Sequence, residues 1–539
     1  MLKQNLFTIS TLLCSAMALM PVSHAEEESD PAEIAIGERL FLETRFAQAY
    51  YANKKAADPA LKYTLTMDEP LRGPFAGKTM NCRACHMVDE HVEARPSGMR
   101  SYADFAHTSP IPNRKDGHHF TPRNSMSLVN IAVKGEDALF HFDGEFNSME
   151  DLVRATLTGR NYGWLANEGT QAIKHVAKII REDEGKGDLA REFGGSYTKI
   201  LTGSDKTISK EFKLPKRFRI NVSKASDKQI FDAVAKLISA YVTDLAFAKD
   251  EKDRYNTSPY DQFLIANKLP RNANKGESEK AYAQRLINKV SQLNEPKFID
   301  EKTAKFKTHQ QQFVFGPLEL QGMKLFFQKG SIKKSGGNCV SCHSAPHFSD
   351  FKFHNTGMTQ FNYDRTHGFD SFNKLEIPGL TVRNKNYSQY LPATYKHPKA
   401  KDPFRSLTNQ DKPGLTDLGM WNIFANPDIP APQKKLKKIV CAQAKQQGMK
   451  NCKDERLLPL TIASFKTPVL RNLGHSDPYM HNGEFPTLKE AVSFYMTSSL
   501  LAQQGDLRNA DPELKHVRIL PSDFEPLVAF LAALNEDYE

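Results

Sequence analysis

The sequence predicts a mainly α-helical chain with long loops and two related halves. Apolar residues recur three and four positions apart from Asp227 to Phe247, which indicates a helix. Long runs of alternating β-branched residues are scarce, and the 30 prolines and 30 glycines are spread through the chain as loop residues. One short cysteine motif occurs twice, at Cys82–His86 and at Cys339–His343.

The repeated motif is C-x-x-C-H, the attachment site of a c-type haem. Two thiols at this spacing can bond the two vinyl groups of one porphyrin, and the next imidazole can bind the iron. A redox dithiol, a zinc half-site or a disulfide would not need a histidine directly after the second cysteine in both copies. We therefore expect two cytochrome c domains, each around a covalent haem. The cofactor-binding residues are then Cys82, Cys85, His86, Cys339, Cys342 and His343, with His86 and His343 as iron ligands.

The first 25 residues have the features of a secretory signal peptide. Lys3 precedes an apolar stretch from Leu6 to Met20, and Ala25 ends a small-residue cleavage site. A single membrane anchor is the alternative, but the apolar run is short for a membrane span. No later segment is apolar enough to cross a bilayer. Export and haem attachment together predict a periplasmic protein.

The remaining chain divides around the two haem motifs. A short apolar segment, expected to be helical, precedes each motif, at Gly37–Phe41 and Gly322–Phe326. The stretch from about Asn267 to Gln311 is polar and rich in Lys and Asn, which is typical of an interdomain connection or an inserted loop. The expected organisation is a signal peptide at 1–25, an N-terminal cytochrome c domain at 26–266, the connection at 267–311 and a C-terminal cytochrome c domain at 312–539.

Cys441 and Cys452 lie outside the haem motifs. In an oxidising compartment we expect them to form a disulfide, and two unpaired thiols are the alternative. The formal net charge of +10 is modest. Lys-rich stretches at Lys206–Lys228 and Lys434–Lys438 are solvated faces or, as a minority interpretation, a docking surface for an acidic redox partner. Nothing in the sequence indicates nucleic acid as a partner.

Beyond the haem motifs, the chain resembles the bacterial dihaem cytochrome c peroxidase and MauG superfamily. The resemblance runs from about Ile34 to Leu534 and depends on several motifs taken together. It implies that the His86 haem reacts with peroxide and that the His343 haem is a six-coordinate electron store. The motifs are Phe120–Asn130, Phe140–Gly144, Ser258–Asp261, Phe353–Gly357, Lys466–Asn472 and Pro478–Gly483, followed by Thr487 and Leu488.

The resemblance also implies the sixth ligand of the second haem. In the family this residue lies 17 positions after the proline of the P-Y-x-H-x-G motif, which is Pro478 here, and the count reaches Tyr495. Tyrosine is typical of MauG-type proteins, and tyrosinate stabilises higher oxidation states of iron. Met496 is the alternative ligand, because helix neighbours point about 100° apart and only one can face the iron. Tyr495 could also be an ordinary core aromatic residue.

Two further sites follow from the resemblance. Asn124, Ser476 and Pro478 match positions that hold Ca²⁺ between the domains, through one Asn side chain and two backbone carbonyls. The alternative is that Asn124 only caps a turn. His118 or His119 lies close to the position of a displaceable distal histidine on the first haem, and the pair could equally belong to a surface loop.

Two residues depart from the family pattern. Phe142 stands where the family has an inter-haem tryptophan, and phenylalanine is much harder to oxidise. Tyr162 stands where the family has the distal glutamate that serves as acid and base in peroxide cleavage. Glu145 and Glu168 are candidates to replace that glutamate.

Two classes of function compete on this evidence. The first is a peroxide-dependent dihaem oxidoreductase, which reduces hydrogen peroxide with electrons from a small cytochrome or copper protein, or oxidises a partner protein in the MauG manner. The second is a non-catalytic dihaem electron carrier with two six-coordinate irons. Tyr495 favours the first class, whereas Phe142 and Tyr162 favour the second.

Overall fold

The structure is a computed structural model that describes residues 30–52, 81–82, 85–86, 111, 114, 116–118, 120–300, 302, 306, 311–471 and 473–536. The expected signal peptide and His119 lie outside these residues. Helices dominate the described part, where the strands form two small two-stranded sheets, in agreement with the predicted helical class. No helix in the described part is both long and apolar enough to cross a bilayer.

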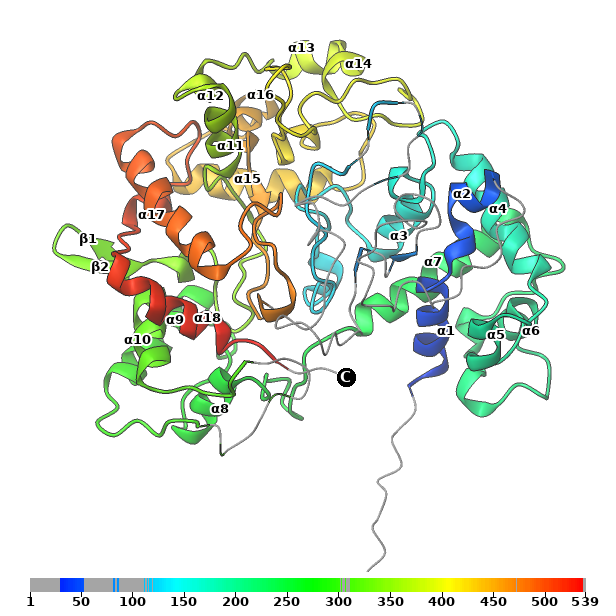
Figure 1. The fold of residues 1–539 in the computed structure, drawn as a ribbon, viewed down its shortest axis with the longest axis horizontal. Coiled ribbons are helices and arrows are strands. Elements are labelled where there is room, and N and C mark those ends of the chain that lie inside the picture. Colours follow the sequence, from blue (N-terminus) through cyan, green and yellow to red (C-terminus); the bar gives the residue numbers. More distant parts are fainter. Residues whose placement is uncertain are drawn as a thin grey trace, which may run out of the picture.

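The first half of the chain packs around one long helix, α7 (Asp227–Asp244), on the right of Figure 1. Ser226 and Gln229 cap its N-terminus reciprocally, which explains why the helix begins there. Gly37 lies in α1 (Ala32–Phe41) and lets this helix pack closely against α7. A Cβ at this position would lie 2.4 Å from the carbonyl oxygen of Leu237 in α7. The helices of this half are α1 (Ala32–Phe41), α2 (Gln48–Ala52), α3 (Met149–Leu157), α4 (Gly169–Glu182), α5 (Asp188–Glu192), α6 (Tyr197–Thr202) and α7.

A second hydrophobic core lies on the left of Figure 1 and combines residues before and after the second haem motif. One of its helices, α9 (Glu279–Ser291), falls within the stretch expected to be a connection. Its Tyr282, Leu286 and Val290 are buried, because they recur at helical spacing and face this core. The other helices are α8 (Pro259–Ala266), α10 (Pro317–Phe327), α17 (Leu488–Gln504) and α18 (Phe524–Ala532).

A third core, at the top of Figure 1, is inserted between the second haem motif and the Lys466–Asn472 motif. The sequence analysis did not separate it from the C-terminal domain. The antiparallel pair β3 (Phe353–His354) and β4 (Phe465–Lys466) brings the two ends of this insert together. Its helices are α11 (Met358–His367), α12 (Ser371–Lys374), α13 (Leu380–Lys385), α14 (Tyr387–Tyr390), α15 (Gln433–Gln446) and α16 (Asp454–Leu457).

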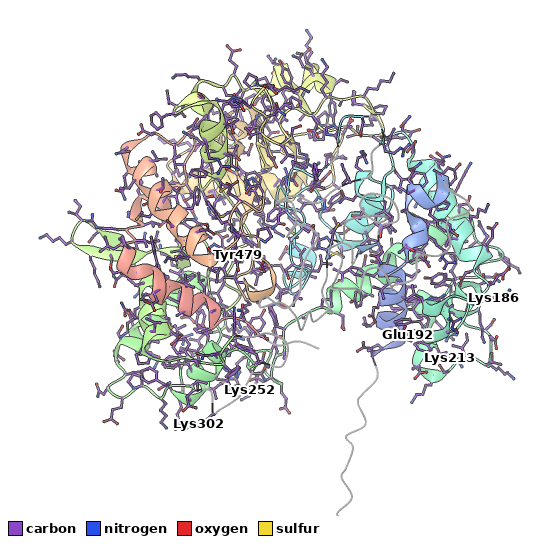
Figure 2. All side chains as sticks on the ribbon, viewed as in Figure 1. Lys186, Glu192, Lys213, Lys252, Lys302 and Tyr479 are labelled. Atoms are coloured by element: carbon purple, nitrogen blue, oxygen red, sulfur yellow. A yellow bond between two sulfur atoms is a disulfide. The ribbon has the colours of Figure 1, made fainter. Side chains whose placement is uncertain are left out.

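Two further features lie outside the cores. A hairpin of β1 (Lys329–Ser331) and β2 (Lys334–Gly337) leads into the second haem motif. Lysines of the Lys-rich stretches are mostly exposed, and Figure 2 shows Lys213 pointing away from the body of the protein. This exposure agrees with the prediction that the Lys-rich stretches form solvated faces.

The predicted disulfide is confirmed, since Cys441 of α15 is bonded to Cys452. Closing a loop of this length is expected to contribute about 3 kcal/mol to stability. Replacing both cysteines by serine should therefore lower the unfolding free energy of the third core by about that amount, measured by urea unfolding. The haem content should stay the same, since the bridge is remote in sequence from both haem motifs. Equal stability of the variant and the parent would contradict this role.

Candidate haem sites

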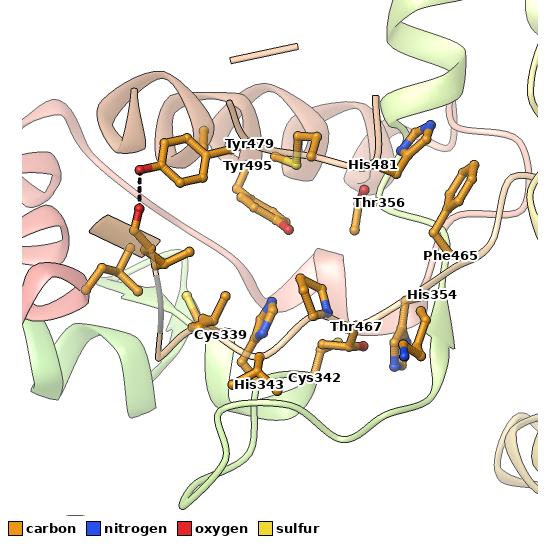
Figure 3. Close-up of a pocket in the computed structure, with 18 of the residues that line it drawn as sticks. Cys339, Cys342, His343, His354, Thr356, Phe465, Thr467, Tyr479, His481 and Tyr495 are labelled. Carbon is orange, nitrogen blue, oxygen red and sulfur yellow. Dashed lines mark hydrogen bonds between the residues drawn. The ribbon is translucent and has the colours of Figure 1, made fainter. Parts of the chain in front are cut away.

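The second C-x-x-C-H motif opens onto a cavity of about 290 Å³. Cys339, Cys342 and His343 form one wall, and Tyr495 of α17 approaches from the opposite wall (Figure 3). Apolar side chains contribute much of the remaining lining, as a porphyrin face requires. Among them are Phe326, Val469, Leu470, Leu473, Val492 and Leu527.

Each motif histidine is oriented by a backbone carbonyl. The Nδ1 of His343 lies 3.0 Å from the carbonyl oxygen of Phe348, and the Nδ1 of His86 lies 2.8 Å from that of Met126. Because a carbonyl only accepts hydrogen bonds, each Nδ1 carries the proton, and the lone pair of the neutral ring is on Nε2. Burial lowers the pKa of both histidines to about 4, so the neutral form that binds iron predominates near neutral pH.

Tyr495 lines the cavity with its hydroxyl directed into it (Figure 3), whereas Met496 is not among the lining residues. Both side chains pack against the second core, but only that of Tyr495 lines the cavity. Burial, together with the nearby sulfurs of Cys342 and Cys339, raises the pKa of the Tyr495 hydroxyl. The tyrosine therefore keeps its proton unless a cation such as haem iron binds its oxygen. Of the two candidate ligands, the geometry favours Tyr495.

The first motif packs against the first core through Cys82, whose Sγ lies 3.2 Å from the hydroxyl oxygen of Tyr162. Tyr162 therefore lies beside the expected haem attachment point. Burial, with the adjacent Cys82, raises its pKa well above the usual value for tyrosine. This phenol keeps its proton near neutral pH, unlike the glutamate that the family has at this position.

The other candidates for the acid–base role, Glu145 and Glu168, are held in ion pairs with arginines. Burial opposes ionisation of Glu145, but the neighbouring Arg405 guanidinium, 2.6 Å away, holds its pKa low. Partial burial likewise opposes ionisation of Glu168, and Arg114 holds its pKa low through an ion pair of 2.6 Å. Both carboxylates stay ionised and cannot donate a proton near neutral pH. The side chain of His118 is exposed, which fits the surface-loop alternative.

The three expected calcium residues meet at the contact between the halves. The Nδ2 of Asn124 lies 2.5 Å from the carbonyl oxygen of Pro478, and the Oδ1 of Asn124 is buried without a hydrogen-bond partner. Ser476 lines the same cavity as these two residues. Because the two ends of an amide can exchange by rotation, Oδ1 could face the Pro478 carbonyl and share a cation with it. The donor set fits Ca²⁺.

A buried charge cluster joins the first half to the third core. Arg123 binds Asp417 through two nitrogens, at 2.6 and 2.9 Å, and also binds Asp143 at 2.5 Å. Arg405 binds Glu145 from the other side. This cluster could not be predicted from the sequence, because Arg123 and Asp417 are 294 positions apart and no local pattern relates them.

Asp402 lies in this cluster, and burial raises its pKa to about 7. Its Oδ1 has no hydrogen-bond partner. The folded state then binds the proton more tightly than the unfolded chain, whose Asp pKa is about 3.9, so stability is lost as pH rises from about 4 to 7. Asp402→Asn should raise the unfolding free energy by about 1–3 kcal/mol at pH 8 and change it little at pH 4. Urea unfolding at both values tests this, with the exposed Asp411→Asn as control. An equal gain at both pH values would contradict the assignment.

Comparisons with known proteins find partial similarity to cytochrome-c peroxidases. No family model matches it. The cytochrome-c peroxidase IdrP1 of Denitromonas iodatirespirans is 26% identical over 209 residues, 39% of this chain and 40% of the relative. The cytochrome-c peroxidase IdrP2 of Pseudomonas sp. (strain SCT) is 27% identical over 208 residues, 38% of each chain. The chain thus matches about two fifths of the length of these curated relatives. Over this part of the chain, the similarity agrees with the predicted resemblance to bacterial cytochrome c peroxidases.

Solved structures are similar over more of the chain. A MauG-like protein associated with microbial copper homeostasis gives a TM-score of 0.45 at 15% identity, covering 94% of this chain and 90% of that one. The diheme peroxidase BthA from Burkholderia thailandensis E264 gives a TM-score of 0.42 at 16% identity, covering 94% and 87%.

Proposed function

We propose that this protein is a periplasmic dihaem c-type cytochrome that uses hydrogen peroxide as an oxidant. The observation that carries the proposal is the pairing of His343, whose Nδ1 is oriented by the Phe348 carbonyl, and Tyr495 across one cavity. The first motif supports it with the same carbonyl-oriented histidine at His86. The curated relatives, which are named cytochrome-c peroxidases, support the reaction class.

In this proposal, residues of both motifs and two tyrosines hold and surround the haems. Cys82 and Cys85 would hold the first haem, with His86 as its iron ligand, and the second motif would hold the other in the same way. When bound, the haems supply the iron centres that react with peroxide and store electrons. Tyr495 would fill the remaining position on the second iron, and Tyr162 would keep a protonated hydroxyl beside the first haem.

The proposed partner is a small redox protein. It is either a cytochrome c or copper protein that donates electrons, or a protein that this enzyme oxidises. Tyr495 supports oxidation of a partner protein, because an anionic oxygen ligand favours the oxidised iron that such a reaction needs. The second candidate function is a non-catalytic electron carrier, which Phe142 and Tyr162 favour, because they replace residues that assist peroxide chemistry in the family.

Electron paramagnetic resonance of the diferric protein separates the two functions. One high-spin signal beside one low-spin signal would show an iron open to peroxide, and stopped-flow mixing should then give a rapid spectral change. Two low-spin signals and no reaction with peroxide would support the carrier instead. N-terminal sequencing of exported protein tests the proposed location, with Glu26 expected as the first residue.

We also propose that Asn124, Ser476 and Pro478 bind Ca²⁺ and thereby hold the two halves together. Removal of Ca²⁺ should lower the unfolding free energy by about 3 kcal/mol relative to protein at a Ca²⁺ concentration a hundredfold above Kd. It should also slow electron transfer between the haems. Thermal unfolding and pulse radiolysis measure the two effects, and Asn124→Ala should be insensitive to Ca²⁺. Unchanged stability and transfer rate after exhaustive chelation would show that no such site exists.

A further inference from the structure

His354 lies in the wall of the second cavity and is held between two carboxylates. Its Nδ1 lies 2.6 Å from an oxygen of Asp511, and its Nε2 lies 3.0 Å from an oxygen of Asp350. An ionised carboxylate only accepts hydrogen bonds, so both ring nitrogens must donate. The ring is therefore a positively charged imidazolium. Burial disfavours this charge, but the hydrogen bonds to the two carboxylates raise the pKa of His354 above its usual value.

The two carboxylates also accept hydrogen bonds from groups other than His354. The other oxygen of Asp350 accepts hydrogen bonds from the Thr467 hydroxyl at 2.9 Å and from the Lys352 amide at 3.0 Å. Asp511 accepts a further bond from the amide of Glu513 at 2.9 Å. Although burial opposes their ionisation, the pKa of each carboxyl is lowered, chiefly by His354.

This cluster adjoins the point where the second haem would be attached. The Sγ of Cys342, a ring nitrogen of His354 and a carboxylate oxygen of Asp511 lie within 4.8 Å of one another. His354 and Asp511 line the same cavity as His343, and Figure 3 shows His354 on the Cys342 side of it. The amide of Asp350 also donates to the carbonyl of Cys342, at 2.8 Å. The charges therefore lie at the edge of the expected porphyrin.

A metal ion is a poor occupant of this cluster, although the three residue types could ligate one. Both nitrogens of His354 are already used as donors to carboxylates, and an imidazolium has no lone pair for a metal. Cys342 belongs to the haem motif, where its sulfur would be alkylated. The cluster is better explained by its charge than by ligation.

We propose that the cluster of Asp350, His354 and Asp511 sets the reduction potential of the second haem. His354 is a positioning residue in this role, since its cation acts on the haem without binding the iron. A buried positive charge favours Fe(II), which carries one positive charge less than Fe(III). Without it, two carboxylates would remain beside the haem and favour Fe(III). The inference rests on the proposed function only in requiring a haem on Cys339 and Cys342.

Redox titration of the two-haem protein, without peroxide, tests this role. His354→Gln should shift the Fe(III)/Fe(II) ratio of the second haem at fixed potential about tenfold towards Fe(III), which corresponds to a potential about 59 mV lower. Asp511→Asn should shift the ratio in the opposite direction, because it removes a negative charge. His354→Lys, which keeps the positive charge, should stay close to the parent.

Opposite shifts in the two variants are the result that supports the role. Shifts in the same direction, or no shift in either, would overturn it, because a purely structural cluster would give one of these. If His354→Gln loses its haem, Asp350→Asn and Asp511→Asn still decide the matter, since both should raise the potential. Opposite shifts in a protein that is inert to peroxide would sustain this inference while refuting the proposed enzyme activity.

Discussion

Replacing both cysteines of the second motif, Cys339→Ser together with Cys342→Ser, is expected to yield a protein with one haem and little peroxidase activity. The first haem would lose its proposed electron store, so the peroxidase turnover proposed above should fall. The second core would also lose the group expected to fill its cavity of about 290 Å³. Loss of the apolar contacts between the haem and the lining should lower the stability of the second core. Both effects follow from one attachment site.

Intact-mass analysis gives the first measurement. The parent should have the mass of the chain from Glu26 plus two haems, and the double variant should have one haem fewer. The matched control is Cys441→Ser with Cys452→Ser, which removes two cysteines outside the motifs and should keep both haems. A parent that carries one haem, or none, would refute the assignment of both motifs and the function built on them.

Local patterns in the sequence predicted the features that depend on neighbouring residues. The helix expected from Asp227 to Phe247 is α7, which ends at Asp244. The third core was not predicted, because its helices are short and its buried residues, such as Phe372, Leu418 and Trp421, follow no single period. Helix α9 was missed because its polar face dominates the composition of a Lys- and Asn-rich stretch.

The same holds for the candidate site, where local patterns indicated some residues and contacts between distant parts of the chain supply the others. The spacing within each C-x-x-C-H motif indicated which residues attach the haem, and the family spacing from Pro478 indicated Tyr495, which the structure places on the cavity wall. The partners that orient and charge the site come from elsewhere in the chain. Asp511 lies 157 positions from His354, and their contact depends on how α17 and the third core fold back on the haem motif.

Outside the haem motif itself, Tyr495 is the cavity-wall residue whose replacement, by phenylalanine, should change the second haem most. Phenylalanine keeps the ring that packs in the wall but removes the oxygen that would bind the iron. The low-spin signal of one haem should change, and its reduction potential should rise because an anionic ligand is lost. We expect a rise of more than about 59 mV, a tenfold change in the ratio of the two oxidation states. Electron paramagnetic resonance and redox titration measure the two changes.

Met496→Ala is the matched control for Tyr495→Phe, because it removes the neighbouring candidate ligand on the same helix. It should leave the spectra of both haems close to those of the parent, since Met496 packs against the second core and does not line the cavity. The spectral change that peroxide produces should decay faster in Tyr495→Phe than in Met496→Ala, because stored oxidising equivalents need the tyrosinate. Phe142 could already shorten that lifetime in the parent, so stopped-flow detection is required. The reverse pattern, with Met496→Ala abolishing the low-spin signal and Tyr495→Phe leaving it intact, would make the chain a Met-ligated peroxidase relative or an electron carrier.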